Sequence, residues 1–138
     1  FIADTSGSIC ELDDPKTLRM LAEHTVLIYI RATDTMIEEL TRRAIASPKP
    51  LYYQEPFLDT RLEEYLQLRG LGTSTEIDPD DFVRWIFPHL VAHRRPRYEQ
   101  IVKEHAYAID ADVIAAVRDE QDFLDLIAQT LERNPGTQ

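Results

Sequence analysis

The apolar positions of this chain fall into short continuous runs separated by stretches with helical spacing. Residues 25–30 form an uninterrupted apolar, β-branched run, and residues 107–110 form a shorter one. Residues 1–5 are expected to be the end of a third strand, which runs into a turn. Continuous runs of this kind are typical of strands buried on both faces of a parallel sheet under helices. The pattern therefore predicts an α/β fold with a mostly parallel sheet.

Helical spacing fills the segments between these strands. A helix is expected to start at Asp14-Pro15, with proline at the first helical position. Thr35 and Glu38 are spaced as a capping box for the next helix. Four more helices are predicted: residues 59–69 (ended by Gly70), a helix from Pro79 that Pro88 ends or kinks, residues 96–104, and a last helix capped by Asp119.

The 138 residues suit one domain, spanning 1–138, in which the proline-rich residues 47–57 form an extended flap. The longest apolar run, residues 26–30, is far below the ~20 residues of a membrane span, so no membrane association is expected. No signal peptide is evident. Cys10 is the only cysteine, which excludes an intrachain disulfide and favours a reducing, cytoplasmic location.

The chain is acidic, with 15 Lys and Arg residues against 25 Asp and Glu residues. Nucleic acid is therefore not an expected partner, because binding its phosphates needs clustered basic side chains. A small anionic ligand needs only a local basic pocket, and residues 94–97 hold three arginines. His89 and His93 have the spacing of zinc ligands but lack a third partner, so neither zinc nor haem is predicted. Helix capping explains the aspartates around Pro79 better than calcium binding does.

Five segments of the chain, in order, carry a resemblance to a known family. They are Asp4-Thr5-Ser6-Gly7-Ser8, residues 21–43, Lys49-Pro50-Leu51-Tyr52, Arg94-Arg95-Pro96-Arg97-Tyr98 and residues 107–112. In the same order they are similar to these parts of the shikimate-kinase-like P-loop kinases: the strand with its substrate-holding glycine turn, the next helix end with its apolar strand and arginine-bearing helix, the mobile lid, the arginine motif for the substrate carboxylate, and the last strand with its nucleotide-base loop. Residues 71–93 look like an insertion relative to this pattern.

The resemblance implies a three-layer P-loop kinase-like parallel sheet with helices on both faces. That fold is incomplete here, since the N-terminal strand and the P-loop are missing: no G-x-x-x-x-G-K-[ST] motif occurs among the four glycines. ATP and Mg²⁺ are therefore expected only if that loop is supplied, and the fragment alone is expected to be inactive. In this family the missing strand lies between the strands at residues 1–5 and 25–32. An N-terminal segment, a partner chain or a rearranged pairing would have to close this gap.

The same resemblance assigns candidate roles, each with a plainer alternative. Asp4 would hold Mg²⁺ or simply form a turn, and Lys49 would contact phosphate from the lid or lie solvated in a loop. Arg42 and Arg43 would touch the nucleotide or form a charge pair near a helix C-terminus. Arg94, Ser6 and Gly7 are assigned to the substrate, and Arg94 would otherwise be one of several exposed basic residues. Asp110 is assigned to the nucleotide-base loop, where it is otherwise an ordinary loop residue.

The expected activity is phosphoryl transfer from ATP to a small hydroxylated, anionic acceptor. Two alternatives stay open: a non-catalytic module that binds nucleotide, a metabolite or a protein, and an ATPase without an acceptor. Only Gly7 remains of the family's three turn glycines, and Lys49 offers a point charge where arginine would offer a bidentate fork. Both departures fit the non-catalytic alternative.

Overall fold

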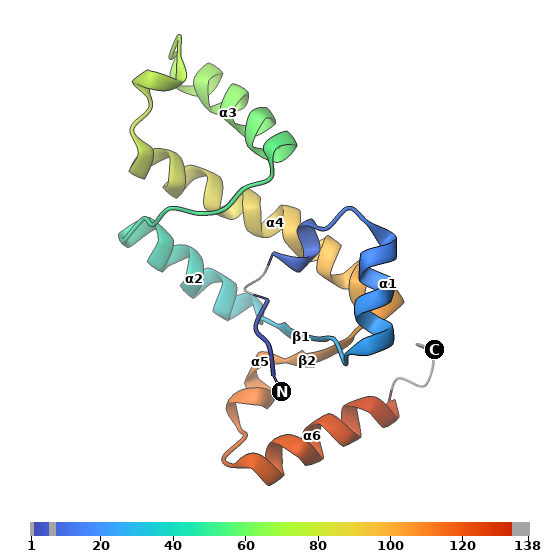
Figure 1. Ribbon diagram of the computed structural model, residues 1–138. Coiled ribbons are helices and arrows are strands. Elements are labelled where there is room, and N and C mark those ends of the chain that lie inside the picture. The colour runs from blue at the N-terminus through green and yellow to red at the C-terminus, as the bar shows by residue number, and fades with distance from the viewer. Residues whose placement is uncertain (1, 6–7, 134–138) are drawn as a thin grey trace. The chain divides into compact units, whose positions relative to one another are not determined.

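The computed structural model describes residues 2–5 and 8–133. It is mixed α/β, mostly helical, with a small parallel sheet of two strands (Figure 1). The described elements are, in chain order, η1 (Ile9–Glu11), α1 (Pro15–His24), β1 (Ile28–Arg31), α2 (Asp34–Ala46), α3 (Glu55–Arg69), η2 (Ser74–Glu76), α4 (Pro79–His105), β2 (Tyr107–Asp110), α5 (Ala111–Ala115) and α6 (Glu120–Arg133). The predicted α/β class is confirmed at this level.

The sheet pairs two segments that are almost 80 positions apart in sequence. β1 and β2 run parallel, with Ile28 opposite Tyr107 and Arg31 opposite Asp110. The amide of Tyr107 donates to the carbonyl of Leu27 at 2.9 Å, which starts the ladder. Both predicted strands are thus confirmed, although β1 begins three residues later than the run that indicated it.

The third predicted strand is wrong for the described residues 2–5, which adopt no regular structure. A strand exists only through hydrogen bonds to a neighbouring strand, and the described part of the chain pairs β1 with β2 alone. An apolar run therefore shows that a segment is suited to a sheet, but a pairing partner decides whether it becomes a strand.

Three of the six predicted helix starts, at Asp14, Pro79 and Asp119, are confirmed by their caps. The Asp14 carboxylate accepts from the amide of Lys16 at 3.1 Å ahead of α1, and Asp119 accepts from the amide of Asp122 at 2.9 Å in α6. The capping box at Thr35 is wrong: Thr35 lies inside α2, and the hydroxyl of Thr33 accepts from the amide of Met36 at 3.2 Å. A threonine two residues earlier thus fulfils the same N-cap role.

Helix α4 differs most from its prediction. It runs unbroken from Pro79 to His105 through both Pro88 and Pro96, so the two separate helices predicted here are one. Proline inside a helix costs ~3 kcal/mol or more. Burial on both sides of Pro88 offsets this cost, since Ile86 is fully buried and Leu90 is 3% exposed.

Helix α3 begins at Glu55, four residues before its predicted start, and takes Pro56 into its first turn. The irregular flap is therefore limited to residues 47–54. The C-terminal end is as predicted: Gly70 has φ 65°, the left-handed conformation that glycine adopts without strain, and its amide bonds back to the helix.

The chain divides into two compact units, Phe1–Met36 with Arg94–Gln138, and Ile37–His93. The Ile37–His93 unit contains both the flap and the segment that resembles an insertion. Its core is aromatic: the Tyr65 ring lies edge-on to Phe82 at 5.1 Å and against Trp85 at 5.1 Å. Its buried residues are Phe57, Tyr65, Phe82, Ile86 and Leu90.

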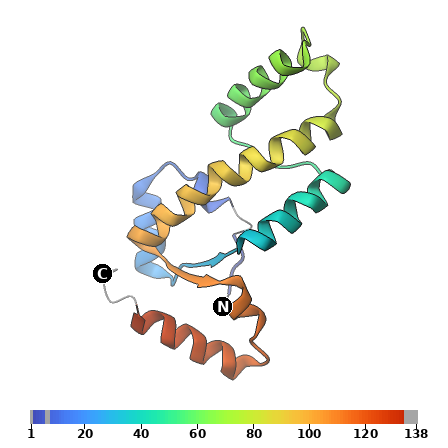
Figure 2. The ribbon, with the colours of Figure 1, turned by 180° about the vertical axis from the view of Figure 1, so that it is seen from behind.

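The other unit contains the sheet. Its core joins Cys10, Ile101 and Ala106, with Leu27 and Tyr98 packed against them. The Tyr98 ring stacks on Tyr29 of β1 with centroids 4.7 Å apart. The C-terminal part of α4 and helix α6 lie on opposite sides of the two strands (Figures 1 and 2).

Candidate functional site

The carboxyl ends of the two parallel strands carry a cluster of charged side chains. Arg31 ends β1, and its Nε and Nη2 atoms donate to the two carboxylate oxygens of Glu99 at 2.8 and 2.7 Å. Its Nη1 atom reaches Asp110, the last residue of β2, at 3.4 Å. In open α/β sheets, ligands bind at the carboxyl ends of the strands, where these side chains lie. Asp110 was assigned to the nucleotide from the sequence, and the structure places it next to a fixed cation.

Arg31 and Glu99 were missed by the sequence analysis. One signal was available, because Arg31 is the first charged residue after the apolar run of β1 and therefore sits at the carboxyl end of a parallel strand. Glu99 had no such signal, since it is one of many acidic residues on a long helix. The bidentate hydrogen bond from Arg31 holds the pKa of Glu99 below its usual range and raises the pKa of Arg31.

This pair gives a pH-dependent prediction. Because the pKa of Glu99 is lower in the folded state than in the unfolded state, its stabilising contribution is full above the unfolded value, ~4.3, and is lost as the pH falls through the folded value. The pair is partly exposed, so Glu99→Gln is expected to destabilise by less than ~1 kcal/mol at pH 7. Urea midpoints at pH 7, 5, 4 and 3 would measure the difference, which should vanish at low pH. The exposed Glu132→Gln is the control, and an equal effect of both variants would contradict the prediction.

Each of the three arginines in the basic cluster at residues 94–97 forms an ion pair with an acidic side chain. Arg94 donates to Glu11 at 2.6 Å, and the Glu11 side chain is only 4% exposed. Arg95 pairs with Asp34 at 3.1 Å, and Arg97 pairs with Asp13. The predicted substrate arginine, Arg94, thus lies in a largely buried ion pair, so an anionic ligand would have to compete with Glu11 for it.

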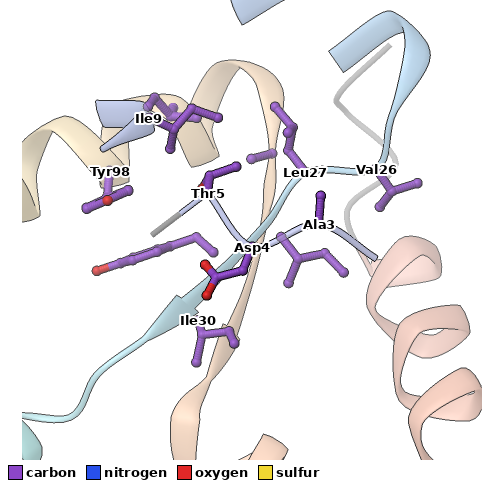
Figure 3. A pocket seen from close by; sticks show the side chains of 12 residues that line it. Ala3, Asp4, Thr5, Ile9, Val26, Leu27, Ile30 and Tyr98 are labelled. Atoms are coloured by element: carbon purple, nitrogen blue, oxygen red, sulfur yellow. The ribbon is translucent and has the colours of Figure 1, made fainter. Parts of the chain in front are cut away.

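A cavity of about 310 Å³ lies along β1 and includes the candidate metal ligand Asp4. Figure 3 shows the carboxylate of Asp4 directed towards the strand, near Ile30. Most of the lining is apolar, and among the described residues that line it Asp4 alone carries a charge at neutral pH. The lining residues are Ala3, Asp4, Thr5, Ile9, Val26, Leu27, Ile28, Tyr29, Ile30, Tyr98, Ile101 and Ala106.

The remaining candidates are dispersed. Ser6 and Gly7 lie outside the described residues. Lys49 is exposed in the flap. Arg42 and Arg43 both pair with Glu39, at 2.8 and 2.7 Å, and these bonds hold the pKa of Glu39 below its usual range. These are ion pairs within one helix, three and four positions apart, and of the two arginines Arg43 lies in the last turn of α2. All three basic residues belong to the Ile37–His93 unit, whereas Asp4, Arg94 and Asp110 belong to the other.

Residues 2–5 and 8–133 contain no group of three or more metal-ligating side chains. Nor does this part of the chain include a helix with both the length and the apolar character to cross a membrane. Comparison with known proteins adds no relative: no protein-family model, no curated protein and no solved structure matches the chain.

Proposed function

We propose that this chain is the acceptor-side part of a P-loop kinase-like protein, which transfers a phosphoryl group from ATP to a small hydroxylated, anionic acceptor. One observation carries the proposal: β1 pairs in parallel with β2, while a cavity lined by residues 3–5 and 26–30 lies along β1. In the fold that this chain resembles, the strand leading into the phosphate-binding loop occupies this place. A strand at this position would bring that loop to the carboxyl ends of β1 and β2, where Arg31 and Asp110 lie.

Phosphoryl transfer depends on positioning and on stabilising negative charge, which suits the residues assigned here. Mg²⁺, when bound, would neutralise phosphate charge, and the exposed carboxylate of Asp4 is the kind of hard oxygen ligand it takes. Arg94 would orient the acceptor carboxylate after exchanging its bond to Glu11. Lys49 lies exposed in a flap without regular structure and would contact phosphate from there.

The test is an ATP-consumption assay with the product of the complete reading frame that contains this sequence. We expect Mg²⁺-dependent consumption that rises when small hydroxylated carboxylic acids are added. Asp4→Asn is expected to lower kcat by at least ~100-fold, because a metal ligand acts on the transition state. Arg94→Ala is expected to raise the KM for the acid.

Asp59→Asn is the matched control, since Asp59 is an exposed aspartate in α3 and should leave kcat unchanged. Equal activity of the Asp4 and Asp59 variants would exclude the role of Asp4. Unchanged acceptor KM and kcat in Arg94→Ala would exclude the role of Arg94. ATP consumption that ignores every acid tested would favour the ATPase alternative.

A second candidate function is a non-catalytic binding module derived from the same fold. The observation that favours it is that the basic side chains already form ion pairs: Arg94, Arg95 and Arg97 each contact a carboxylate within the described chain. A module of this kind would bind nucleotide without turnover. Equilibrium binding of ATP in an intact protein with no detectable phosphate release, with or without acids, would support this candidate against the kinase.

A further inference from the structure

Another cavity lies at the amino ends of the two strands, the opposite end from Arg31 and Asp110. Its volume is about 480 Å³, within the range of small-molecule sites. The C-terminal parts of α1 and α4 and the first residues of the strand segments border it, and all of them belong to the sheet-containing unit. The lining residues are Arg19, Ala22, Glu23, Thr25, Val26, Leu27, Glu104, His105 and Tyr107.

Two opposite charges line this cavity from one helix. Arg19 and Glu23 are four positions apart on α1, so their side chains lie next to each other on the same face. Neither side chain takes part in a hydrogen bond or an ion pair within residues 2–5 and 8–133. A base four residues before an acid is the weaker order for a helical ion pair, because each charge then opposes the helix dipole. Both charges are therefore available to a ligand.

The negative side of the cavity is the larger. The carboxylate of Glu104 accepts from Gln100 and lies 3.7 Å from Nε2 of His105. Helices α1 and α4 both end close to where the strands begin (Figures 1 and 2). A helix C-terminus favours a cation, so the two helix ends add to the charges of Glu23 and Glu104. A cationic group thus has several partners here, and an anionic group has Arg19.

Apolar side chains form the rest of the lining. Ala22, Leu27 and Tyr107 are half-buried, whereas Val26 is 54% exposed. An apolar group of a ligand would remove part of this surface from water, which is favourable in proportion to the area covered. The cavity therefore presents three kinds of partner within one small volume: a cation, two carboxylates at helix ends, and an apolar surface.

We propose that this cavity binds a free α-amino acid with an apolar side chain. Arg19 receives the carboxylate of the ligand. Glu23, Glu104 and the helix ends receive its ammonium group, which has three N–H donors. The ligand's side chain covers Val26 and Leu27. A simple anion would meet two carboxylates and a simple cation would meet Arg19, so a zwitterion is the better match. This binding does not depend on phosphoryl transfer, because the cavity lies at the other end of the strands.

The probe is L-leucine, titrated into the ¹⁵N-labelled chain. We expect saturable shifts of the amide signals of Glu23, Leu27 and Tyr107, with those of Arg31 and Asp110 unchanged. Isopentylamine lacks the carboxylate of leucine and 4-methylpentanoate lacks its ammonium group, so each should bind about tenfold more weakly, since each loses a charge-assisted hydrogen bond.

Three outcomes of this titration would overturn the proposal. The first is the absence of saturable binding up to about 50 mM leucine. The second is a set of shifts centred on Arg31 and Asp110. The third is equal affinity for leucine and isopentylamine, which would make the cavity a site for simple amines.

Two substitutions assign the charges. Arg19→Gln should remove the preference for leucine over isopentylamine, and Glu23→Gln should reduce the preference for leucine over 4-methylpentanoate. Both side chains are exposed, so the helical circular dichroism should stay at its wild-type value. Lys16→Gln is the matched control, because it removes an exposed cation from the same helix but outside the cavity, and it should bind leucine within twofold of wild type. Equal leucine affinity of the Arg19 and Lys16 variants would reject the assigned carboxylate partner and with it the proposal.

Discussion

Replacing Glu11 by alanine is expected to lower the free energy of unfolding of the sheet-containing unit by about 3–5 kcal/mol. The Glu11 side chain is 4% exposed and accepts from Arg94, which is itself only 21% exposed. Removing one member of a buried ion pair leaves a desolvated charge without that partner, which costs far more than losing an exposed pair. The expected loss is a large fraction of the stability of an ordinary domain.

Hydrogen exchange of the Tyr29 and Ile109 amides in the sheet would measure this loss locally. Asp13→Ala is the matched control: it removes an acid only two positions away that pairs with Arg97, but whose side chain is 74% exposed. That variant should cost no more than ~1 kcal/mol. If Glu11→Ala and Asp13→Ala destabilise equally, burial does not control the strength of the Glu11–Arg94 pair.

The Glu11 variant also bears on function. If Arg94 serves an anionic acceptor, removal of Glu11 frees the guanidinium for the ligand, so the acceptor should bind more tightly to Glu11→Ala at temperatures where the variant stays folded. If Arg94 is a purely structural cation, Glu11→Ala changes stability alone. Acceptor titration of the intact protein and its Glu11→Ala variant would distinguish the two outcomes.

Ile86→Ala is expected to destabilise the Ile37–His93 unit by about 2–5 kcal/mol. Ile86 is fully buried in the core that contains Tyr65 and Phe82. Truncation to alanine removes buried methyl groups and leaves a cavity that rigid aromatic neighbours cannot easily fill. The same residue also helps to hold α4 continuous past Pro88, so the variant is expected to raise hydrogen exchange in the turn that follows the proline.

Trp85 is the only tryptophan of the chain and lies in this core, so its fluorescence during urea unfolding reports on the Ile37–His93 unit. Leu68→Ala is the control, because Leu68 lies on the neighbouring helix α3 but is 65% exposed. It should change stability by less than ~0.5 kcal/mol. A loss below ~1 kcal/mol for Ile86→Ala would show that the core is loosely packed at this point.

Local sequence signals determined much of the secondary structure. The apolar runs marked β1 and β2, Asp14 and Asp119 marked helix starts, and Gly70 marked the end of α3. Each of these depends on a few adjacent residues, because caps, left-handed turns and apolar strands are set by side chains and dihedral angles in the immediate neighbourhood. Asp110 could be placed at the end of a parallel strand for the same reason.

Features that depend on distant residues were decided by the tertiary structure alone. Burial of Ile86 and Leu90 carries α4 through Pro88, although local propensity predicts an end or a kink there. Residues 2–5 have the composition of a strand but no strand partner beside them. Propensity is worth only fractions of a kcal/mol per residue, so burial and pairing override it.

The candidate site divides in the same way. The sequence by itself placed Asp110 at the end of a strand and Arg94 in a basic cluster, whereas the strand predicted to end beside Asp4 is absent from the described residues. It contained no signal that Arg94 meets Glu11, 83 positions away, or that Arg31 meets Glu99, 68 positions away. Charge pairing across such separations arises when helices and strands pack, so which acidic side chain each of these arginines meets follows only from the fold.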